Sequence, residues 1–412
     1  MKTSILLTLL SLIVFNANRL FAADRVVQHN GPAGTYASIT AAVTAAADGD
    51  IIIVNNRQDA LPWVEDLTIN KSLTFVSAVD NIQWWMEGNI SIATAEGRNV
   101  TIVGMKNPSS WGQITKTGAN PVSRTLLNIT YSEIGGDITM ISGVNLYLGS
   151  SKARNVSFSY GKIIGNDLYS LSCSPDAVAT EDVNLIIGNR IGYNIGTPTN
   201  AFTTTSTSQY LFFSNNLAKA NEYGILISAL KSGTVPNRIV NSVAITISWL
   251  NSALYIGQAS GQLLVDNSML CGNYGNSYNS GSGVKSSGSV ATSLTTFTYN
   301  IYYNPSGSLA GTISLNSAQG NLASSAVNST LINSSGLPTS GTVQVNAGSP
   351  MNEYLDLDLT RNDVGVYGGS YSHTNFLPFM SNTESSRVNY MNTPRVVNQG
   401  GTVNVQVIGY DK

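Results

Sequence analysis

The stretch Gly34–Val54, GTYASITAAVTAAADGDIIIV, predicts one short helix that leads directly into a β-strand. Apolar residues recur in it at the spacing of one helix face: Ile39, Ala42, Val43 and Ala46. Asp48-Gly49-Asp50 ends this helix, because glycine accepts the left-handed conformation of a C-cap. The β-branched run Ile51–Val54 starts a strand. We therefore expect the helix Tyr36–Ala47 to cap the first layer of a stack of strands.

The composition favours strands and turns. Charged residues make up 11% of the 412 residues, well below the ~25% of ordinary globular proteins. The chain also contains 38 Gly and 19 Tyr and is rich in Asn, Ser and Thr. Its formal net charge is −2, so no basic field favours nucleic acid or an anionic membrane as a partner. An anionic polymer would have to be bound by local cations.

The first 22 residues have the pattern of a signal peptide. A basic start at Met1-Lys2 precedes the apolar core Ile5–Phe15 and the small residues of Phe21-Ala22-Ala23. The apolar run is shorter than the ~20 residues that cross a bilayer, and no later run is longer. We expect an exported protein, secreted or on the cell surface, without a transmembrane span.

Four short segments share one pattern, in which an apolar strand, a turn with asparagine and a second strand follow each other. They are NLIIGNRI (Asn184–Ile191), YLFFSNNL (Tyr210–Leu217), QLLVDNSML (Gln262–Leu270) and FTYNIYY (Phe297–Tyr303). Their turn asparagines are Asn189, Asn215, Asn267 and Asn300, at intervals of 26, 52 and 33 residues. The double interval predicts one further coil around Ala244–Leu250.

This pattern predicts a solenoid, in which equivalent strands stack and loops vary in length. Asparagine suits its turns because it accepts left-handed dihedrals and can bond its copy in the next layer. The alternative is a β-sandwich, whose strands recur at ~10-residue intervals without a larger repeat.

Two segments resemble a known family. The opening stretch with LTINKSLTFV (Leu67–Val76), and LDLDLTRNDVGVYGG (Leu355–Gly369) near the other end, resemble secreted bacterial right-handed parallel β-helix proteins of the pectate-lyase-like fold. The RNDVGVYGG variant is most similar to proteins of the Bacteroidetes group. The resemblance implies an all-β, right-handed parallel β-helix (solenoid) over residues 23–371. It does not imply one activity, because this fold carries lyases, hydrolases, esterases and adhesins.

Residues 372–412 predict a C-terminal β-hairpin tail. Gln399-Gly400-Gly401 is a turn signal, and Val403, Val405 and Val407 alternate with other residues as in a half-buried strand. The tail either folds back on the stack, which we favour, or pairs its free edge with a partner.

The two cysteines, Cys173 and Cys271, are 98 positions apart. A solenoid would separate them by several layers, whereas a disulfide needs Cα atoms within ~7 Å. Two separate buried thiols are therefore favoured over a disulfide.

Three groups of charged residues are candidates for chemistry. Asp176, Glu181 and Asp182, with Arg190 nearby, could hold Ca²⁺ if they meet on one face; the alternative is a solvated loop and no cofactor. The second group is basic and consists of Lys152, Arg154 and Lys162, near Asp167. It could provide the base and the charge clamp of a lyase, or it could lie on a solvated strand face. His29 and His373 lie too far apart in sequence for a two-histidine site.

The third charged group is the acidic element near the end of the predicted solenoid. Its members are Asp356, Asp358, Arg361 and Asp363. Alternation places Asp356 and Asp358 on one side of a strand. They could bind Ca²⁺, but we favour a structural role, in which they satisfy the last strands and close the stack.

Aromatic residues provide a second kind of candidate site, one that binds a glycan. Tyr274 and Tyr278 lie in a Gly/Asn/Ser loop, and Trp84 and Trp85 lie near a turn. Such flat amphipathic rings suit sugar faces. The alternatives are core packing for one tryptophan and an ordinary loop for the tyrosines.

Two functions follow from these observations. The first is an exported, non-catalytic surface or matrix protein that binds a polysaccharide or surface glycan, or mediates adhesion, through its long face. The second is a polysaccharide lyase or related glycan-degrading enzyme, which the resemblance alone suggests. No lyase, hydrolase or esterase motif of the fold is found in the sequence.

Overall fold

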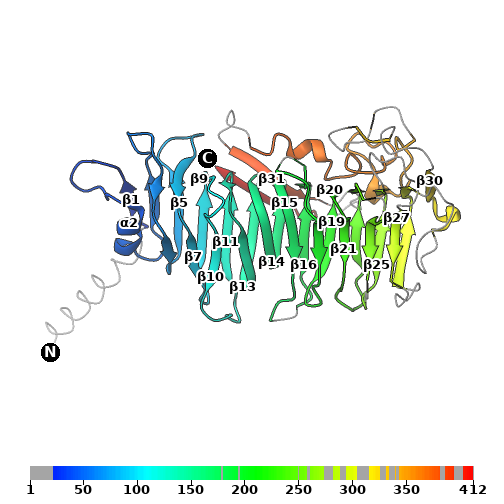
Figure 1. Cartoon of the computed structure of the whole chain (residues 1–412), viewed down its shortest axis with the longest axis horizontal. Coiled ribbons are helices and arrows are strands. Elements are labelled where there is room, and N and C mark those ends of the chain that lie inside the picture. Colours follow the sequence, from blue (N-terminus) through cyan, green and yellow to red (C-terminus); the bar gives the residue numbers. More distant parts are fainter. Residues whose placement is uncertain are drawn as a thin grey trace.

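The chain folds into an elongated rod of stacked parallel strands, a parallel β-helix (Figure 1). The computed structural model describes residues 22–177, 180–193, 195–248, 250–257, 260–272, 282–287, 294–303, 315–324, 331–333, 339, 343–380, 386–393 and 402–411. In this part of the chain, 30 strands form one hydrogen-bonded sheet that winds around the rod. This confirms the predicted β-helix and excludes the β-sandwich.

Each coil contributes up to three strands, which stack into three parallel ladders. Ladder A comprises β1 (Asp24–Val27), β2 (Ile51–Val54), β5 (Leu73–Ser77), β8 (Asn99–Val103), β11 (Thr125–Thr130), the ends of β13 (Ile138–Gly149) and β14 (Lys152–Ile164), β16 (Val183–Ile187), β19 (Tyr210–Ser214), β22 (Asn237–Val240), β25 (Leu263–Asp266) and β28 (Thr295–Thr298).

Ladder B comprises β3 (Trp63–Val64), β6 (Trp84–Glu87), β9 (Met105–Asn107), β12 (Glu133–Ile134), the starts of β14 and β15 (Asp167–Cys173), β17 (Arg190–Ile191), β20 (Leu217–Ala220), β23 (Val243–Thr246), β26 (Met269–Cys271), β29 (Ile301–Tyr303) and β30 (Leu322–Ser324). Ladder C comprises β4 (Leu67–Ile69), β7 (Ile90–Ala93), β10 (Ile114–Thr117), parts of β13, β14 and β15, β18 (Asn200–Thr204), β21 (Tyr223–Ile227), β24 (Ser252–Ile256) and β27 (Ser282–Ser286).

The interior of the rod is a continuous hydrophobic core. Alternate residues of each strand point inward, and aliphatic residues dominate the buried cluster. Phe202 and Phe213 stack inside it with ring centroids 4.7 Å apart. Cys173 and Cys271 are both buried and are not paired with each other, as the spacing predicted. Burial raises the pKa of the Cys173 thiol to about 12.

The predicted N-terminal helix is present as α2 (Ile39–Ala45), which lies at the N-terminal end of the rod (Figure 1). It buries Ile39, Ala42 and Val43 in the core. Two side chains of the next coil bind its ends. The Glu65 carboxylate accepts from the N–H groups of Ile39 and Thr40 at 2.9 and 2.8 Å, and the Lys71 ammonium donates to three carbonyls of the last turn.

These contacts explain how seven residues remain helical. A helix this short is marginal in water, but opposite charges at its two ends stabilise it. The helix ends at Ala46, whose φ is −69°, so Gly49 is not the C-cap that the sequence suggested. Gly49 instead has a φ of +93° in the turn that leads into β2.

A buried ladder of asparagine and serine side chains runs along the turn between ladders A and B. Its members are Ser132, Ser151, Asn166, Asn189, Asn216, Ser242, Ser268, Asn300 and Asn321. Each side-chain oxygen accepts the backbone N–H of the equivalent residue one coil earlier. Asn189 N–H, for example, donates to Asn216 Oδ1 at 2.9 Å, and Asn216 Nδ2 donates to the Ile186 carbonyl at 2.7 Å.

The predicted stacking of turn asparagines is thus confirmed for Asn189 and Asn300. In the other two turns the stacking residue follows the predicted one: it is Asn216 after Asn215, and Ser268 after Asn267. Asn215 and Asn267 precede the ladder and adopt positive φ angles of 54° and 51°. The coil predicted around Ala244–Leu250 is also present, and Asn241-Ser242 forms its turn. The repeating unit is therefore a left-handed residue followed by a ladder residue.

The ladder predicts a graded loss of stability. Asn216→Ala removes one acceptor and one donor and leaves the buried N–H of Asn189 unpaired, so the free energy of unfolding should fall by about 3 kcal/mol. Asn216→Ser, which keeps an uncharged acceptor of the kind that Ser242 provides in the next coil, should lie between the two proteins. The matched control is Asn404→Ala at an exposed site, expected within about 0.5 kcal/mol. Chemical denaturation measures all four, and equal midpoints would contradict the role of the ladder.

The C-terminal residues return along the outside of the rod as a strap, which we define as residues 343–380, 386–393 and 402–411. The strap follows the stripe of left-handed turn residues toward the N-terminal end. Asn267 Oδ1 accepts from Ser349 N at 2.7 Å, and Asn215 Nδ2 donates to the Gly368 carbonyl at 2.7 Å. Farther along, a Cβ at Gly188 would collide with the Phe376 ring. Short 3₁₀ turns lie in and before the strap: η2 (Ser317–Gln319), η3 (Asn352–Tyr354) and η4 (His373–Phe376).

The strap covers apolar residues that ladder B presents outward in its last coils. Val364 and Val366 pack there against Leu217, Val243 and Met269 in a second hydrophobic cluster. Beyond this cluster, β31 (Ser386–Asn392) and β32 (Gln406–Asp411) form an antiparallel hairpin. It lies on the middle of the rod (Figure 1). The tail thus folds back on the stack, and its predicted turn at 399–401 lies outside the described residues.

The strap should be sensitive to acid through His373, which is buried against the ring of Phe379. Burial lowers the pKa of His373 to about 4, whereas an unfolded histidine titrates near ~6.5. The unfolded chain therefore binds more protons between these values, so stability should fall by up to about 3 kcal/mol as pH drops from ~6.5 to ~4.

His373→Gln tests this expectation, because it removes the titration. Burial and neighbouring carboxylates raise the pKa of Asp356 to about 6, so that group contributes in the opposite direction between pH ~4 and ~6. The difference between variant and wild-type denaturation midpoints, measured from pH 7 to pH 4, isolates His373. A difference that does not change with pH would refute the expectation.

Candidate functional site

The tryptophan pair divides between the core and the surface. Trp84 is fully buried, stacks on Phe75 at 6.2 Å and donates its indole N–H to the Val103 carbonyl. Trp85 is half-buried on the outer face of ladder B, where Lys106 Nζ lies 5.2 Å from its ring centroid. Tyr274 and Tyr278 lie outside the described residues, so the glycan site predicted for their loop stays a prediction.

The structure does not bring the predicted Ca²⁺ ligands together. The Asp176 carboxylate is buried, bonds Arg124 Nε at 2.7 Å and accepts from Ser142 Oγ at 3.0 Å. Glu181 is exposed and pairs with Lys231 at 3.2 Å, and Asp182 is exposed. Among the described residues, no group of three or more His, Cys, Asp or Glu side chains could hold a metal ion.

One member of the predicted basic group, Lys152, belongs with the neighbouring Asp167 to a ladder of alternating charge on the outer face of ladder B. Five successive coils contribute Lys106, Glu133, Lys152, Asp167 and Arg190. Lys152 lies 3.3 Å from Glu133, and Arg190 lies 2.9 Å from Asp167. Opposite charges on neighbouring strands stabilise a sheet by only ~0.2–1 kcal/mol per pair, so this row is a structural feature. Arg154 is exposed beside it.

The acidic element near the end of the chain lies within the strap, along the side of the rod. Asp356 accepts from the N–H groups of Gly369 and Asp363 at 2.8 and 3.1 Å. Arg361 Nε donates to the Gly348 carbonyl at 2.6 Å, and Asp358 bonds Thr360. The strap contacts Asn215, Asn241 and Asn267 in three successive turns, so the acidic element shapes a segment that lies beside the coils. Its predicted role in closing the last coil stays a prediction.

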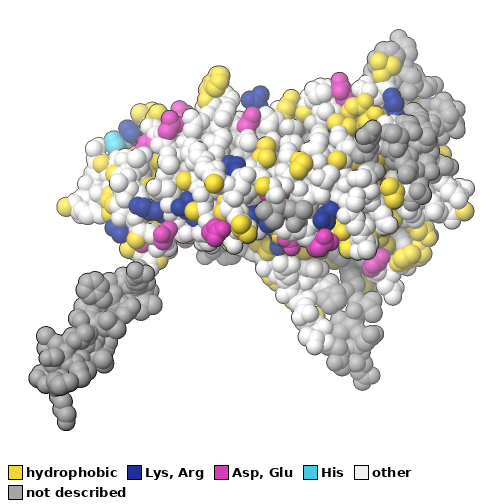
Figure 2. Space-filling model, turned by 90° about the horizontal axis from the view of Figure 1, so that it is seen from below, with side chains coloured by type: hydrophobic (Ala, Val, Ile, Leu, Met, Phe, Trp, Pro, Cys, Tyr) yellow, Lys and Arg dark blue, Asp and Glu magenta, His cyan; other side chains and the backbone are white. Residues whose placement is uncertain are grey.

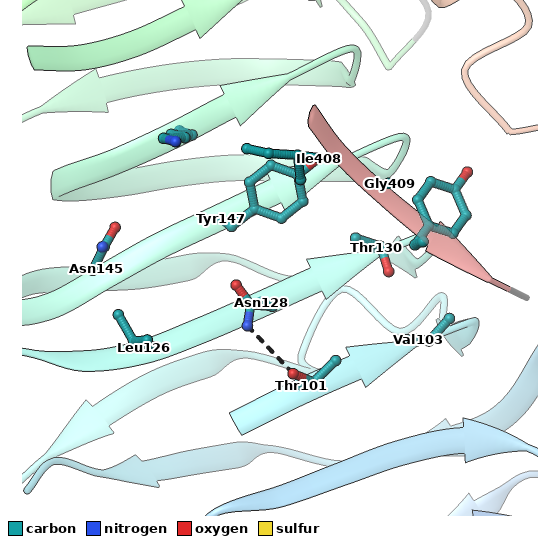
Figure 3. A pocket seen from close by; sticks show the side chains of 11 residues that line it. Thr101, Val103, Leu126, Asn128, Thr130, Asn145, Tyr147, Ile408 and Gly409 are labelled. Carbon is teal, nitrogen blue, oxygen red and sulfur yellow. Dashed lines mark hydrogen bonds between the residues drawn. The ribbon is translucent and has the colours of Figure 1, made fainter. Parts of the chain in front are cut away.

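A groove with a volume of about 490 Å³ lies between the outer face of ladder A and strand β32. It is lined by Thr101, Val103, Leu126, Asn128, Thr130, Asn145, Tyr147, Lys162, Ile408, Gly409 and Tyr410. Figure 3 shows Thr101 and Asn128 on neighbouring strands, with a hydrogen bond of 3.3 Å between them. On the same view β32 crosses the sheet, and Ile408 lies beside the Tyr147 ring. We call this cavity the hairpin groove.

Stacking generates the polar floor of this groove. Thr101, Asn128, Tyr147 and Lys162 occupy the same outward position in four successive strands. The hairpin provides the wall, which is fixed by Asn389: its Nδ2 donates to Tyr147 Oη at 3.2 Å, and its Oδ1 accepts from Ser150 Oγ at 2.7 Å. Tyr410 stacks near Tyr131, with centroids 6.5 Å apart.

The groove contains a single charged side chain among its described lining residues, Lys162. Its ammonium lies 5.8 Å from the ring centroid of Tyr390, and burial lowers its pKa. None of the described residues that line the groove carries a carboxylate. Amide and hydroxyl groups beside tyrosine rings and one cation suit an oxygen-rich ligand with apolar faces.

The sequence identified Lys162 but missed Thr101, Asn128 and Tyr147. Their outward positions follow from strand alternation, which was a usable signal. Ile408 and Tyr410, which form the wall, lie about 260 residues after Tyr147 in the chain. No local sequence pattern indicates where this segment docks.

On the face of the rod that Figure 2 shows, most of the surface is uncharged and polar. Figure 2 shows scattered charged and hydrophobic side chains on a mostly white face. On ladder C, one outward row consists of hydroxyl residues in seven successive strands: Thr68, Ser91, Thr115, Thr139, Ser157, Ser172 and Thr203.

Comparisons with known proteins add no family assignment: no protein-family model, no curated protein and no solved structure matches this chain. The class that the fold defines is a parallel β-helix with long polar faces. In the part of the chain that is described, no helix has the length and hydrophobicity required to cross a membrane. The predicted leader, residues 1–22, lies almost entirely outside that part.

The Arg124–Asp176 pair yields a prediction that separates a structural role from a ligand role. The Asp176 side chain is 2% exposed and that of Arg124 is 12% exposed. Arg124→Met would leave a buried carboxylate without its cation, so the free energy of unfolding should fall by about 3–5 kcal/mol. The matched control is Lys152→Met, whose side chain is 43% exposed, expected to cost less than about 1 kcal/mol. Thermal denaturation measures both variants, and equal losses of stability in Arg124→Met and Lys152→Met would refute the structural role of the pair.

Proposed function

We propose that this protein is exported and that it binds a polysaccharide or surface glycan through the hairpin groove, without catalysing a reaction on it. The observation that carries the proposal is the groove lining, in which Asn128, Asn145 and Thr101 lie beside tyrosine rings and one ammonium group. Sugars present hydroxyl groups at their edges and C–H groups on their faces, so this combination of residues suits them.

Four further observations support this proposal. The signal-peptide pattern of residues 1–22 supports export, and a net charge of −2 makes nucleic acid a poor partner. The resemblance of Gly34–Val54 and Leu355–Gly369 to secreted β-helix proteins of the pectate-lyase-like fold, including Bacteroidetes proteins, supports a role at glycans. The long uncharged faces suit adhesion to a matrix, because hydroxyl and amide rows hydrogen-bond without a charged partner.

A second candidate function is glycan cleavage by a lyase mechanism, which one observation favours. Burial lowers the pKa of Lys162, and a lowered pKa makes the neutral amine, which is the form that accepts a proton, more accessible than in an exposed lysine. In such a β-elimination, with or without Ca²⁺, Lys162 would remove the C5 proton next to a uronate carboxylate. A C4–C5 double bond would form as the C4–O glycosidic bond breaks, and the departing oxygen would take a proton from water. Incubation with pectin, alginate and glycosaminoglycans, followed by absorbance of the unsaturated product, decides this candidate.

The binding proposal is tested with glycan arrays and with immobilised uronate polysaccharides. Lys162→Met and Asn128→Ala should each weaken binding at least tenfold, because each removes a polar contact from the groove, which corresponds to about 1.4 kcal/mol. The matched control is Arg154→Met, which removes an exposed cation outside the groove and should bind as the wild type does.

Two outcomes would overturn the proposal. The first is background binding by the wild-type chain on every glycan. The second is binding that Lys162→Met and Asn128→Ala leave unchanged; a Tyr274→Ala/Tyr278→Ala variant would then test the loop that the sequence indicated.

A further inference from the structure

The hairpin divides one continuous outward row of ladder A into two parts. After Tyr147 and Lys162, this row continues through Leu185 on β16, Phe212 on β19 and Arg238 on β22. Strand β31 covers its middle, where Tyr390 packs in one cluster with Leu185 and Phe212. The hairpin groove lies on the N-terminal side of this cover, so the Arg238 end of the row lies on the other side.

A second cavity occupies that other side, with a volume of about 300 Å³. We call it the Arg238 cleft. It is lined by Val183, Leu185, Tyr210, Leu211, Phe212, Val235, Pro236, Arg238, Tyr371, Tyr390 and Asn392. A smaller cavity of about 100 Å³ adjoins it and shares Phe212, Arg238 and Tyr371.

Aromatic rings and one cation form the centre of the cleft. Tyr390 stacks on Tyr371 with centroids 5.7 Å apart, and Tyr371 meets Phe212 edge-on at 6.3 Å. The Arg238 guanidinium carbon lies 6.0 Å from the Phe212 ring and 5.7 Å from the Tyr354 ring. Phe212, Tyr371 and Arg238 are all half-buried, so each retains a surface for a ligand.

The hydrogen bonds of Arg238 leave part of its donor capacity available. One Nη donates to Tyr354 Oη, which in turn donates to Asp266 Oδ2 at 2.9 Å. Arg238 Nε is buried and has no partner among the described residues, so a ligand would meet the Nη groups of a side chain that is 30% exposed. One Nη also lies 4.0 Å from Asp266 Oδ2, and the contacts with Tyr354 and Asp266 orient the guanidinium.

We propose that the Arg238 cleft is a second saccharide-binding site, separate from the hairpin groove, for the same class of acidic glycan. This inference rests on the proposed function. Its basis is that both cavities combine tyrosine rings, at least one asparagine amide and a single cation among their described lining residues. The adjoining smaller cavity adds the carboxylate of Glu353. An arginine can hold a sugar carboxylate through parallel N–H donors.

Two sites on one rigid face would let a single molecule bridge glycan chains. Asn128 and Arg238 are five layers apart in the row, which corresponds to ~24 Å at ~4.8 Å per layer. The hairpin stands between them, so two ligands can bind at once without touching. Linked sites of this kind raise avidity for a polymer far above the affinity of either site.

The test is calorimetric titration of the full chain with a trisaccharide of uronic acid residues. The wild type should bind two equivalents. Arg238→Gln should reduce the stoichiometry to one equivalent, bound in the hairpin groove. The double variant Arg238→Gln/Lys162→Met should lose this site as well. Lys162→Met alone should leave one site, the Arg238 cleft.

A second variant guards against misfolding of Arg238→Gln. Val235 lies at the cleft and is 47% exposed, so Val235→Trp fills the cavity without removing a contact of the core. It should also reduce the stoichiometry to one. The control is Val403→Trp, on an exposed part of the strap outside both cavities.

The possible outcomes separate the two proposals. One equivalent in the wild type, abolished by Lys162→Met and unaffected by Val235→Trp, would refute the second site and leave the hairpin groove standing. Two equivalents that persist in Val235→Trp would also refute it. No binding of the trisaccharide at all would overturn the proposed function together with this inference.

Discussion

The rod depends on one repeated interaction, the bond from a turn N–H to the side-chain oxygen of an asparagine or serine in the next coil. The turn between ladders A and B lies inside the molecule, where water cannot satisfy its backbone. An unpaired buried N–H costs about 1–3 kcal/mol, and the ladder from Ser132 to Asn321 removes this cost at nine successive turns. The same bonds fix the register of the coils, because each side chain reaches one layer only.

The residue before each ladder position has a separate role, which links the coils to the strap. A left-handed turn directs the Asn215, Asn241 and Asn267 side chains outward, where they bind the strap backbone. Where this position is glycine, as at Gly188, the bare backbone admits the Phe376 ring. The turn thus provides an inner ladder that holds the stack and an outer stripe that guides the C-terminal residues along it.

The strap in turn creates the candidate sites. Without the hairpin, the outward row of ladder A would be a flat surface, and a flat polar surface binds a small ligand weakly. The hairpin raises one wall for each cavity and places Tyr390 over Lys162. Both proposed sites therefore combine a floor made by stacking with a wall made by a segment far away in sequence.

The sequence by itself determined the elements and the way they stack. Strand alternation, asparagine turns and the Gly34–Val54 stretch predict a helix, short strands and a solenoid, because these signals depend on neighbouring residues. The same reasoning identified Lys162 and the hairpin tail. It placed the stacking asparagine one residue early at Asn215 and Asn267, since local propensity cannot tell which of two adjacent polar residues points inward.

The tertiary structure decided where distant segments meet. It placed Trp84 in the core, paired Asp176 with Arg124, and laid Asp356 along the side of the rod. It also brought Asn389 to Tyr147, which are 242 positions apart. Such contacts leave no periodic signal, because their energy depends on shape and burial in the assembled rod. The architecture is therefore encoded locally, whereas the grooves that carry the proposed function exist only after the strap has docked.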